Sequence, residues 1–263
     1  MKATCLASSS AGNCYIFEFD IMGCRKTIMV ECGIPYSSIL KKCNENNIKL
    51  SSVECCLITH AHSDHCVAAS KLEALNIPIY ASRHTLSKIN VNGVELCPNT
   101  PNRVLNGLYV YPFEVEHDIE GAYGFIFKTA SETILFVNDS KTWKANLINF
   151  KPDIVFIECN YDNKIVYAQY HSIKDKLNNI DNYTNEQVRE LRTTLKQHER
   201  NINAHMSLYG TIRNLKKLNL RYCNAIMLMH LSDRYANEYK MKNEIQSTFG
   251  IKTYVCGKKG GIK

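Results

Sequence analysis

The chain has 263 residues, of which 45% are hydrophobic and 22% are charged, with a formal net charge of +7 and twelve cysteines. A chain of this length can bury one large core, and we expect a single domain over residues 1–263. No stretch reaches the roughly 18 apolar residues of a membrane-spanning helix, and the early apolar run is too short for a signal peptide, so we expect a cytoplasmic protein with no membrane partner.

Hydrophobic periodicity predicts strands early in the chain and strands alternating with helices later. The predicted strands cover residues 2–7, 14–19, 26–31, 51–60, 77–82, 108–117, 123–129, 133–139, 153–158, 224–230 and 252–256. The predicted helices cover residues 35–47, 66–75 and 235–246, and a long polar and helical stretch runs from 161 to 218. A strand meander followed by this alternation predicts an α/β fold with two sheets and helices packed outside them.

The strand predicted over residues 51–60 leads into "THAHSDHC", which places His60, His62, Asp64 and His65 close together. Residues two apart in extended chain face the same way, so His60 and His62 can point at one cation, and Asp64 and His65 follow as the chain turns. Imidazole and carboxylate ligands suit a borderline divalent ion such as zinc, with manganese or iron as alternatives. The motif therefore predicts a metal site just beyond the end of a strand.

A histidine or an aspartate also ends each of three further predicted strands. His117, Asp139 and His230 each follow an apolar run. Each one alone is compatible with a simple turn cap. Active-site residues of sheet-based folds gather on loops at strand ends, and the three together therefore indicate one functional edge.

The cysteines and the late basic residues also bear on function. The cysteines are scattered through apparent strands and helices, and no C-x-x-C pair occurs, so we expect reduced thiols and no structural zinc knuckle. The late basic residues are compatible with a polyanionic partner and equally with solvated helix faces. These residues are Arg189, Arg192, Lys196, Arg200, Arg213, Lys216, Lys217 and Arg221.

At this point the chain resembles the metallo-β-lactamase fold superfamily over most of its length. "LITHAHSDH" matches the superfamily motif. "CLASSSAGNCYIF", "IMVECGI" and "VEHDIEGAYGFIF" look most like the YycJ-like exonuclease branch, and "HLSDRY" is nearer ribonuclease Z. "INAHMSLYGTI" is similar to a segment in which both branches carry a histidine beside the reaction centre. The resemblance implies a four-layer αββα sandwich with two divalent metal ions, zinc first and manganese second.

The resemblance also implies roles for individual residues. The first metal would be held by His60, His62 and His117, the second by Asp64, His65 and His230, and Asp139 would bridge both. Two cations about 3.5–4 Å apart can stabilise the attacking and departing oxygens of a phosphoryl displacement, and a water shared between them becomes hydroxide near neutral pH. His205 would donate a proton to the leaving oxygen or stabilise charge on the phosphate, and Asp64 would also orient the hydroxide.

The chain departs from the family pattern in three places. Glu31 stands where relatives usually carry an aspartate, and this longer carboxylate bears on the support of the metal ligands. Tyr161 stands in place of a histidine that would face the substrate. The segment 161–204 is longer than in the exonuclease branch and has no residue-by-residue match.

The leading hypothesis is a metal-dependent phosphodiesterase that cuts nucleic acid. A cyclic-nucleotide phosphodiesterase, of the kind by which phages erase defence signals, is the alternative within the same chemistry. A non-catalytic scaffold stabilised by metals is the alternative from another class. Hydrolysis of thioesters or lactams is disfavoured, and a flavodiiron role would call for a flavin domain for which the chain has no room. A homodimer is compatible with the sequence. The sequence does not distinguish among DNA, RNA and cyclic nucleotides as substrates.

Overall fold

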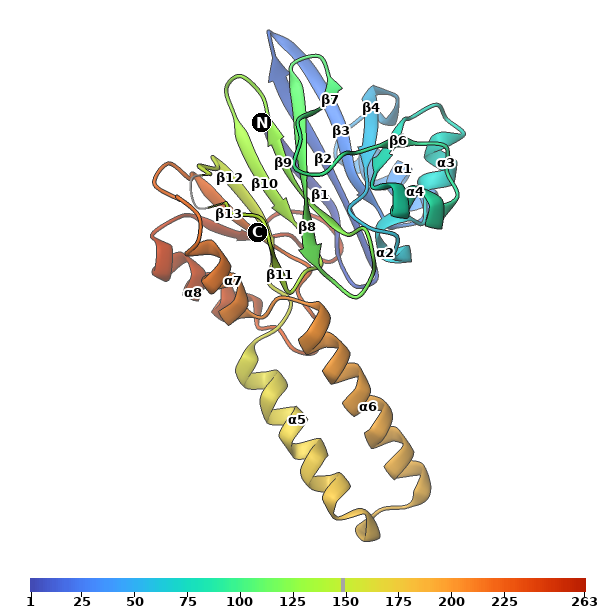
Figure 1. Cartoon of the computed structure of the whole chain (residues 1–263), viewed down its shortest axis with the longest axis vertical. Coiled ribbons are helices and arrows are strands. Elements are labelled where there is room, and N and C mark those ends of the chain that lie inside the picture. The colour runs from blue at the N-terminus through green and yellow to red at the C-terminus, as the bar shows by residue number, and fades with distance from the viewer. Residues whose placement is uncertain (148–149) are drawn as a thin grey trace.

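The computed structural model describes residues 1–147 and 150–263 and arranges the strands in two sheets packed face to face (Figure 1). The first sheet contains, in spatial order, β1 (Lys2–Ser9), β2 (Gly12–Ile21), β3 (Cys24–Cys32), β4 (Val53–Leu57), β5 (Ile79–Ala81) and β6 (Val94–Glu95). The second contains, in spatial order, β11 (Thr142–Trp143), β8 (Leu108–Glu116), β9 (Tyr123–Lys128), β10 (Thr133–Val137), β12 (Ile154–Glu158), β13 (Ala225–Met229) and β14 (Thr253–Val255), and β7 (Asn102–Leu105) pairs with β8.

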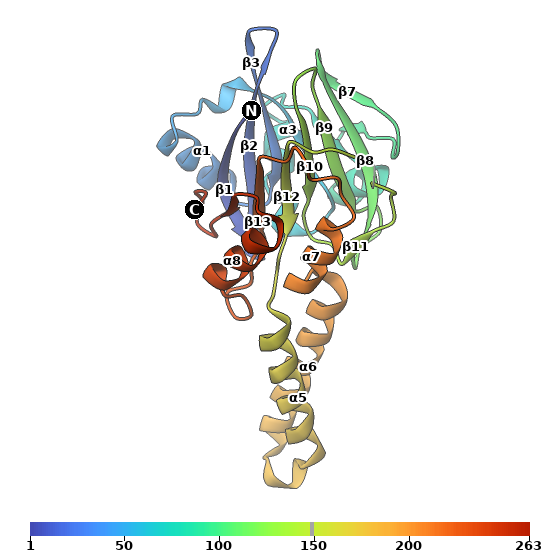
Figure 2. The ribbon, with the colours of Figure 1, turned by 90° about the vertical axis from the view of Figure 1, so that its left-hand side faces the viewer.

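The helices lie outside the sheets or extend away from them (Figures 1 and 2). Those near the first sheet are α1 (Tyr36–Glu45), α2 (Ser63–Cys66), α3 (Ala69–Glu73) and α4 (Arg83–Ile89), with the short 3₁₀ helix η1 (Leu50–Ser52) before β4. Those that follow β12 are α5 (Asn163–Asn178), the 3₁₀ helix η2 (Ile180–Asn182), α6 (Asn185–Ala204), α7 (Leu208–Leu215) and α8 (Glu238–Phe249).

Three hydrophobic clusters define four layers. Between the sheets lie the aromatic side chains Phe17, Phe127, Phe136 and Phe156, all fully buried. A second cluster joins the outer face of the first sheet to α1 and α3, and a third joins the second sheet to α7 and α8. Helix, sheet, sheet and helix therefore follow one another, as expected for an α/β fold of the αββα type.

The direction of the strands determines where the functional residues lie. β10, β12 and β13 run parallel, and β8 has the same direction because β9 is antiparallel to both β8 and β10. Their carboxyl ends therefore meet at one edge of the second sheet. The early meander and the later alternation match the sequence prediction, whereas α4, β6, β7 and β11 are short elements without a clear sequence pattern.

The stretch predicted only as polar and helical contains the most prominent feature of the shape. α5 and α6 form an antiparallel pair, called the hairpin below, that extends from the lower end of the sandwich (Figures 1 and 2). Thr184 begins α6 with a capping box, in which its hydroxyl accepts from the Gln187 backbone and the Gln187 side chain accepts from the Thr184 backbone. Only part of such a helix can be buried, because it packs on one neighbour.

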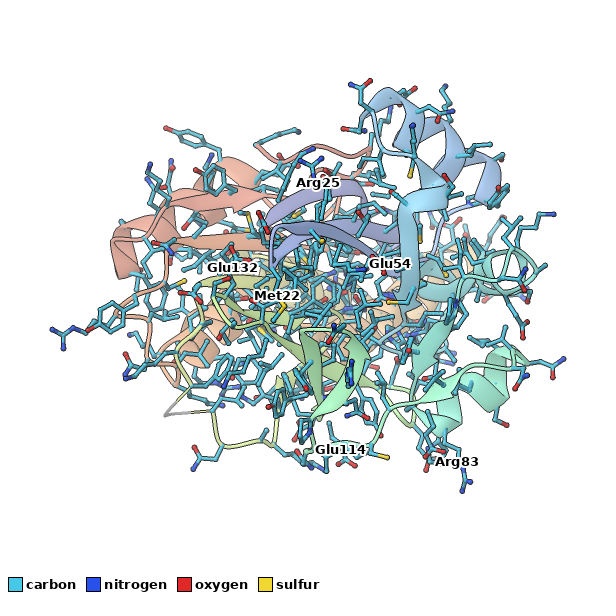
Figure 3. All side chains as sticks on the ribbon, turned by 90° about the horizontal axis from the view of Figure 1, so that it is seen from above. Met22, Arg25, Glu54, Arg83, Glu114 and Glu132 are labelled. Atoms are coloured by element: carbon cyan, nitrogen blue, oxygen red, sulfur yellow. The ribbon has the colours of Figure 1, made fainter. Side chains whose placement is uncertain are left out.

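The opposite end of the sandwich faces the viewer in Figure 3 and has a different character. Met22, at the turn between β2 and β3, is 92% exposed there. Nearby, Lys26 pairs with Glu54 at 3.0 Å and the N-terminal amine pairs with Glu132. Within the described ranges, no helix is long and apolar enough to cross a membrane.

Candidate metal centre

The loop after β4 brings the histidine motif beneath the carboxyl end of β3. A Cβ on Gly33 would lie 1.6 Å from the backbone oxygen of Asp64, so only glycine allows the two segments to approach this closely. His62 lies at the N-cap of α2, and Asp64 and His65 lie within that helix. The close approach therefore holds the motif against the sheet, with His65 fully buried.

The first group of candidate ligands is His60, His62 and His117. Nε2 of His60 lies 3.0 Å from Nδ1 of His62, which lies 3.2 Å from Nε2 of His117. The other nitrogen of His60 donates to the Thr59 hydroxyl, because that hydroxyl donates its own hydrogen to Glu31. Nδ1 of His117 donates to the carbonyl oxygen of Ala204 at 3.0 Å. With these donor contacts, the neutral form of His60 and of His117 presents an unprotonated nitrogen to the group, as a metal requires.

The second group is Asp64, His65, Asp139 and His230. Nε2 of His65 lies 3.4 Å from Asp64 Oδ2 and 3.3 Å from Asp139 Oδ2, and Nε2 of His230 lies 3.7 Å from Asp64 Oδ2. The two groups adjoin, since the rings of His60 and His65 have centroids 4.0 Å apart. The structure thus brings together all seven residues for which the sequence predicted a ligand role, in two sets whose ligand atoms lie within 4.8 Å of one another in each set.

Glu31 supports one ligand from each group. Its carboxylate accepts from the hydroxyl of Thr59 at 2.5 Å and lies 3.2 Å from Nδ1 of His65. Through Thr59 it also orients His60. Glu31 has a φ of 61°, a conformation that costs on the order of 1–3 kcal/mol in a residue with a side chain. The longer carboxylate therefore still reaches the ligands, from a backbone position that is itself strained.

Glu158, at the end of β12, has a corresponding position on the other side of the site. This fully buried carboxylate accepts from the backbone of Ser140 at 2.7 Å and of Met206 at 3.1 Å. Its Oε1 lies 2.6 Å from Nδ1 of His205 and 3.2 Å from Nδ1 of His230. The sequence prediction missed Glu158, although it ends the apolar run "DIVFIE" as the other strand-end residues end theirs.

His205 lies beside the second group and forms the C-cap of α6. Its ring stacks on that of His230, with centroids 5.2 Å apart and planes inclined by 17°. Burial is the largest single influence on His205 and lowers its pKa, but the charge of Glu158, the hydrogen bond to it and the charge of Asp139 together raise the pKa above its ordinary value. Since Nδ1 is held by Glu158, Nε2 is the nitrogen left for substrate.

Histidine pKa values shift in opposite directions in the two groups of candidate ligands. Burial, and then neighbouring histidines, lower the pKa values of His60 and His62, which favours the neutral form that binds metals. Burial is the largest single influence on His230 and lowers its pKa, but the charge of Asp139 and the contacts with Asp64 and Glu158 together outweigh burial and raise that pKa to about 10. The carboxylates of the second group thus create a negative environment that favours a cation.

Buried polar atoms that lack a hydrogen-bond partner indicate whether these residues fit metal ions. Among the described residues, the buried atoms Asp139 Oδ1 and His230 Nε2 have no hydrogen-bond partner. Buried polar atoms are rarely left so, because each costs free energy. Cations held by the two groups would satisfy these atoms and the converging nitrogens of His60, His62 and His117. The residues therefore fit divalent metal binding.

A cavity of about 620 Å³ opens onto both groups, since His62, Asp64, Asp139 and His230 all lie on its wall. The remaining wall comes partly from α6, which contributes Arg200, and from the loop after β13. Nε of Arg200 donates to Asp118 at 2.7 Å, and Asp118 Oδ1 lies 3.1 Å from Nε2 of His117. The root of the hairpin is therefore part of the site, which the sequence did not reveal.

Tyr161 lies away from the wall of the cavity. It is 3% exposed and is absent from the cavity wall, and Leu208 donates to its backbone oxygen at 2.8 Å. Burial raises the pKa of its hydroxyl to about 12. Asn160, one residue earlier, lies on the cavity wall and donates to the carbonyl oxygen of His230 at 2.9 Å. The tyrosine thus joins β12 to α7 instead of facing substrate.

Replacing Glu158 with glutamine should loosen the support of His205 and His230 without changing the size of the side chain. We expect metal affinity and turnover to fall about 10–100-fold, the range for residues that orient ligands. Competition with a chromogenic chelator measures the affinity. Glu114→Gln, at an exposed carboxylate on β8, is the matched control and should leave the affinity unchanged (Figure 3). Wild-type metal affinity in the Glu158 variant would contradict a supporting role.

Comparisons with known proteins identify relatives of similar sequence or fold. Exodeoxyribonuclease WalJ of Streptococcus pneumoniae is 22% identical over 236 residues, which cover 83% of this chain and 86% of that protein. The metallo-beta-lactamase fold protein YhfI of Bacillus subtilis has a TM-score of 0.69 at 16% identity, covering 99% of this chain and 98% of that one. The short form of human tRNase Z has a TM-score of 0.58 at 16% identity, covering 89% and 94%.

The family match covers most of the site. Residues 28–230 match the beta-lactamase superfamily domain, a range that includes the motif loop and extends to His230. The two solved structures share the fold of sandwiched sheets. With the candidate ligands together at one edge of that fold, the chain belongs to the beta-lactamase superfamily domain family and is a metal-dependent hydrolase.

Proposed function

We propose that the chain hydrolyses phosphodiester bonds of nucleic acid with two divalent metal ions, zinc by preference. The observation that carries the proposal is the adjoining pair of ligand groups on one cavity, with His60 and His65 in ring contact between them. Relatives named for nuclease activity, exodeoxyribonuclease WalJ and human tRNase Z, support the substrate class.

Each residue then has a chemical task. His60, His62 and His117 would hold one ion, Asp64, His65 and His230 the other, and Asp139 both. Two such ions stabilise the attacking and departing oxygens of a displacement and lower the pKa of water. Asp64 lies on the cavity wall, where its carboxylate can orient that water.

Two more residues act on the phosphate. His205 can present Nε2 to the leaving oxygen, because Glu158 holds its other nitrogen and raises its pKa. Arg234 and Arg200, the latter paired with Asp118, lie on the same wall, and guanidinium groups match phosphate geometry. The cavity thus combines proton donation with charge complementary to a phosphodiester.

Assays on labelled DNA, RNA and cyclic nucleotides test the proposal. The protein is stripped with a chelator and reloaded with zinc or manganese, and elemental analysis verifies two ions per chain. We expect nucleic acid to be cut by the loaded protein and not by an Asp139→Ala variant prepared in parallel, which excludes a contaminating nuclease. Failure to cut DNA and RNA in the two-metal form, or hydrolysis of cyclic nucleotides alone, would overturn it.

A further inference from the structure

The hairpin carries a row of basic residues whose position the fold does not explain. Arg189, Arg192, Lys196 and Arg200 follow one another on α6 at intervals of three, four and four residues, which places them on one face of the helix. They are called the basic face below. At 1.5 Å per residue the face extends about 16 Å along the helix. All four side chains belong to exposed residues.

The partners of Lys217 differ from those of the basic face. Lys217 of α7 donates to Asn214 at 2.9 Å and lies over the ring of Trp143, so it has a structural role. Within residues 1–147 and 150–263, Arg189, Arg192 and Lys196 form no ion pair with a carboxylate. Three adjacent cations that form no ion pair repel one another and favour an anionic partner.

The basic face connects the metal cavity to a groove further out on the hairpin. At its inner end Arg200 lies on the wall of the cavity, one turn of helix from Lys196. At its outer end Arg189, Arg192 and Lys196 line a groove of about 630 Å³ together with Tyr183 and one acidic residue, Asp181, so three cations face one carboxylate there. A chain of phosphates that leaves the cavity along α6 would therefore meet a cation at each turn and an aromatic ring near the tip.

We propose that the basic face binds the sugar-phosphate backbone of a single-stranded nucleic acid whose end lies in the metal cavity. The proposal rests on the proposed function above. A positively charged groove with an aromatic ring for base stacking is the usual means of binding single strands. A cavity of about 620 Å³ is of the size that holds a drug-sized ligand, which is also the size of the terminal nucleotides of a single strand.

A triple substitution, Arg189→Ala with Arg192→Ala and Lys196→Ala, tests the face without altering Arg200. Binding of a labelled 20-nucleotide single strand is measured by fluorescence anisotropy in chelator, which prevents cleavage. We expect affinity to fall on the order of tenfold, because three phosphate contacts are lost. The slope of log affinity against log salt should become less steep by about two, since each contact to a single strand contributes about 0.7.

Three lysines of the same hairpin provide the matched control. Lys164, Lys174 and Lys176 are exposed and distributed around α5, so replacing them with alanine removes the same charge from a different helix. We expect less than a twofold change in affinity for this variant. Equal salt slopes in the two triple variants would overturn the proposal, because net charge alone would then account for binding.

Cleavage separates this inference from the proposed function. If the metal-loaded wild type cuts no nucleic acid, the proposed function fails, while the binding comparison in chelator still decides on the basic face. If it cuts, the ratio of kcat/KM for a 20-nucleotide strand over a dinucleotide should fall at least about fivefold in the variant of the basic face. The inference would be overturned if this ratio of kcat/KM values did not change. It would also be overturned if the triple substitution changed the oligomeric state and left the affinity for the single strand unchanged.

Discussion

Replacing Asp139 with alanine is expected to remove at least one of two metal ions and to reduce turnover to the background rate. The carboxylate is 3% exposed and lies within 3.3 Å of His65 and 3.5 Å of His230. Without a shared anion, two cations repel. Unit charges 4 Å apart interact by about 4 kcal/mol at an effective dielectric constant of about 20, and divalent ions by more. Elemental analysis of the purified variant counts the ions per chain.

Two further variants show whether metal is lost because of the missing charge, the missing side-chain volume or a general loss of stability. Asp139→Asn keeps the size of the side chain and should lose metal as the alanine variant does, because charge is the missing property. Asp153→Ala removes a carboxylate near the start of β12, where Asp153 accepts from the backbone of Thr133 at 2.7 Å, and should keep both ions. Two ions per chain in the Asp139 variants would rule out a bridge.

Replacing His205 with alanine is expected to leave metal content and fold intact and to slow turnover about 10²–10⁴-fold, the range for a positioned proton donor. The ring is held by Glu158 at 2.6 Å and lines the cavity, but nothing in the proposal makes it a ligand. KM should change much less than kcat, because a contact formed mainly in the transition state acts on rate. Steady-state kinetics on a labelled oligonucleotide measures both.

The loss of His205 leaves Glu158 with its backbone donors at Ser140 and Met206, so the fold should tolerate the change. His171→Ala, at an exposed histidine of α5, is the matched control and should have wild-type kinetics. If the His205 variant has full metal content and wild-type turnover, the residue has no part in the reaction. If it loses metal instead, His205 supports the ligands and does not act on substrate.

Local sequence was sufficient for the strand-end residues. His60 and His62 are separated by one residue, and His117, Asp139 and His230 each follow an apolar run, so their chemistry and their places at strand ends were readable from periodicity. Because active-site residues of sheet-based folds gather at strand ends, a functional role for these residues was the simplest expectation. The same reasoning could have included Glu158, which also ends an apolar run.

The hairpin illustrates where local patterns are insufficient. The segment 161–204 was readable as polar and helical, and its basic residues as a solvated face or a binding surface. Periodicity determines which residues share a face of α6, but it does not determine where that face points. The structure places Arg200 against Asp118 and Ala204 against His117, which are pairs separated by more than eighty residues.

The sequence by itself determined the kinds of atoms available for metal binding, the strands that carry them and the family to which the chain belongs. Only the tertiary structure decided which atom of each ring faces the metal groups, because that depends on the hydrogen bond made by the other nitrogen. For His60 that partner is Thr59, held by Glu31, and for His230 it is Glu158. Such contacts join distant segments through packing, and no short-range pattern encodes them.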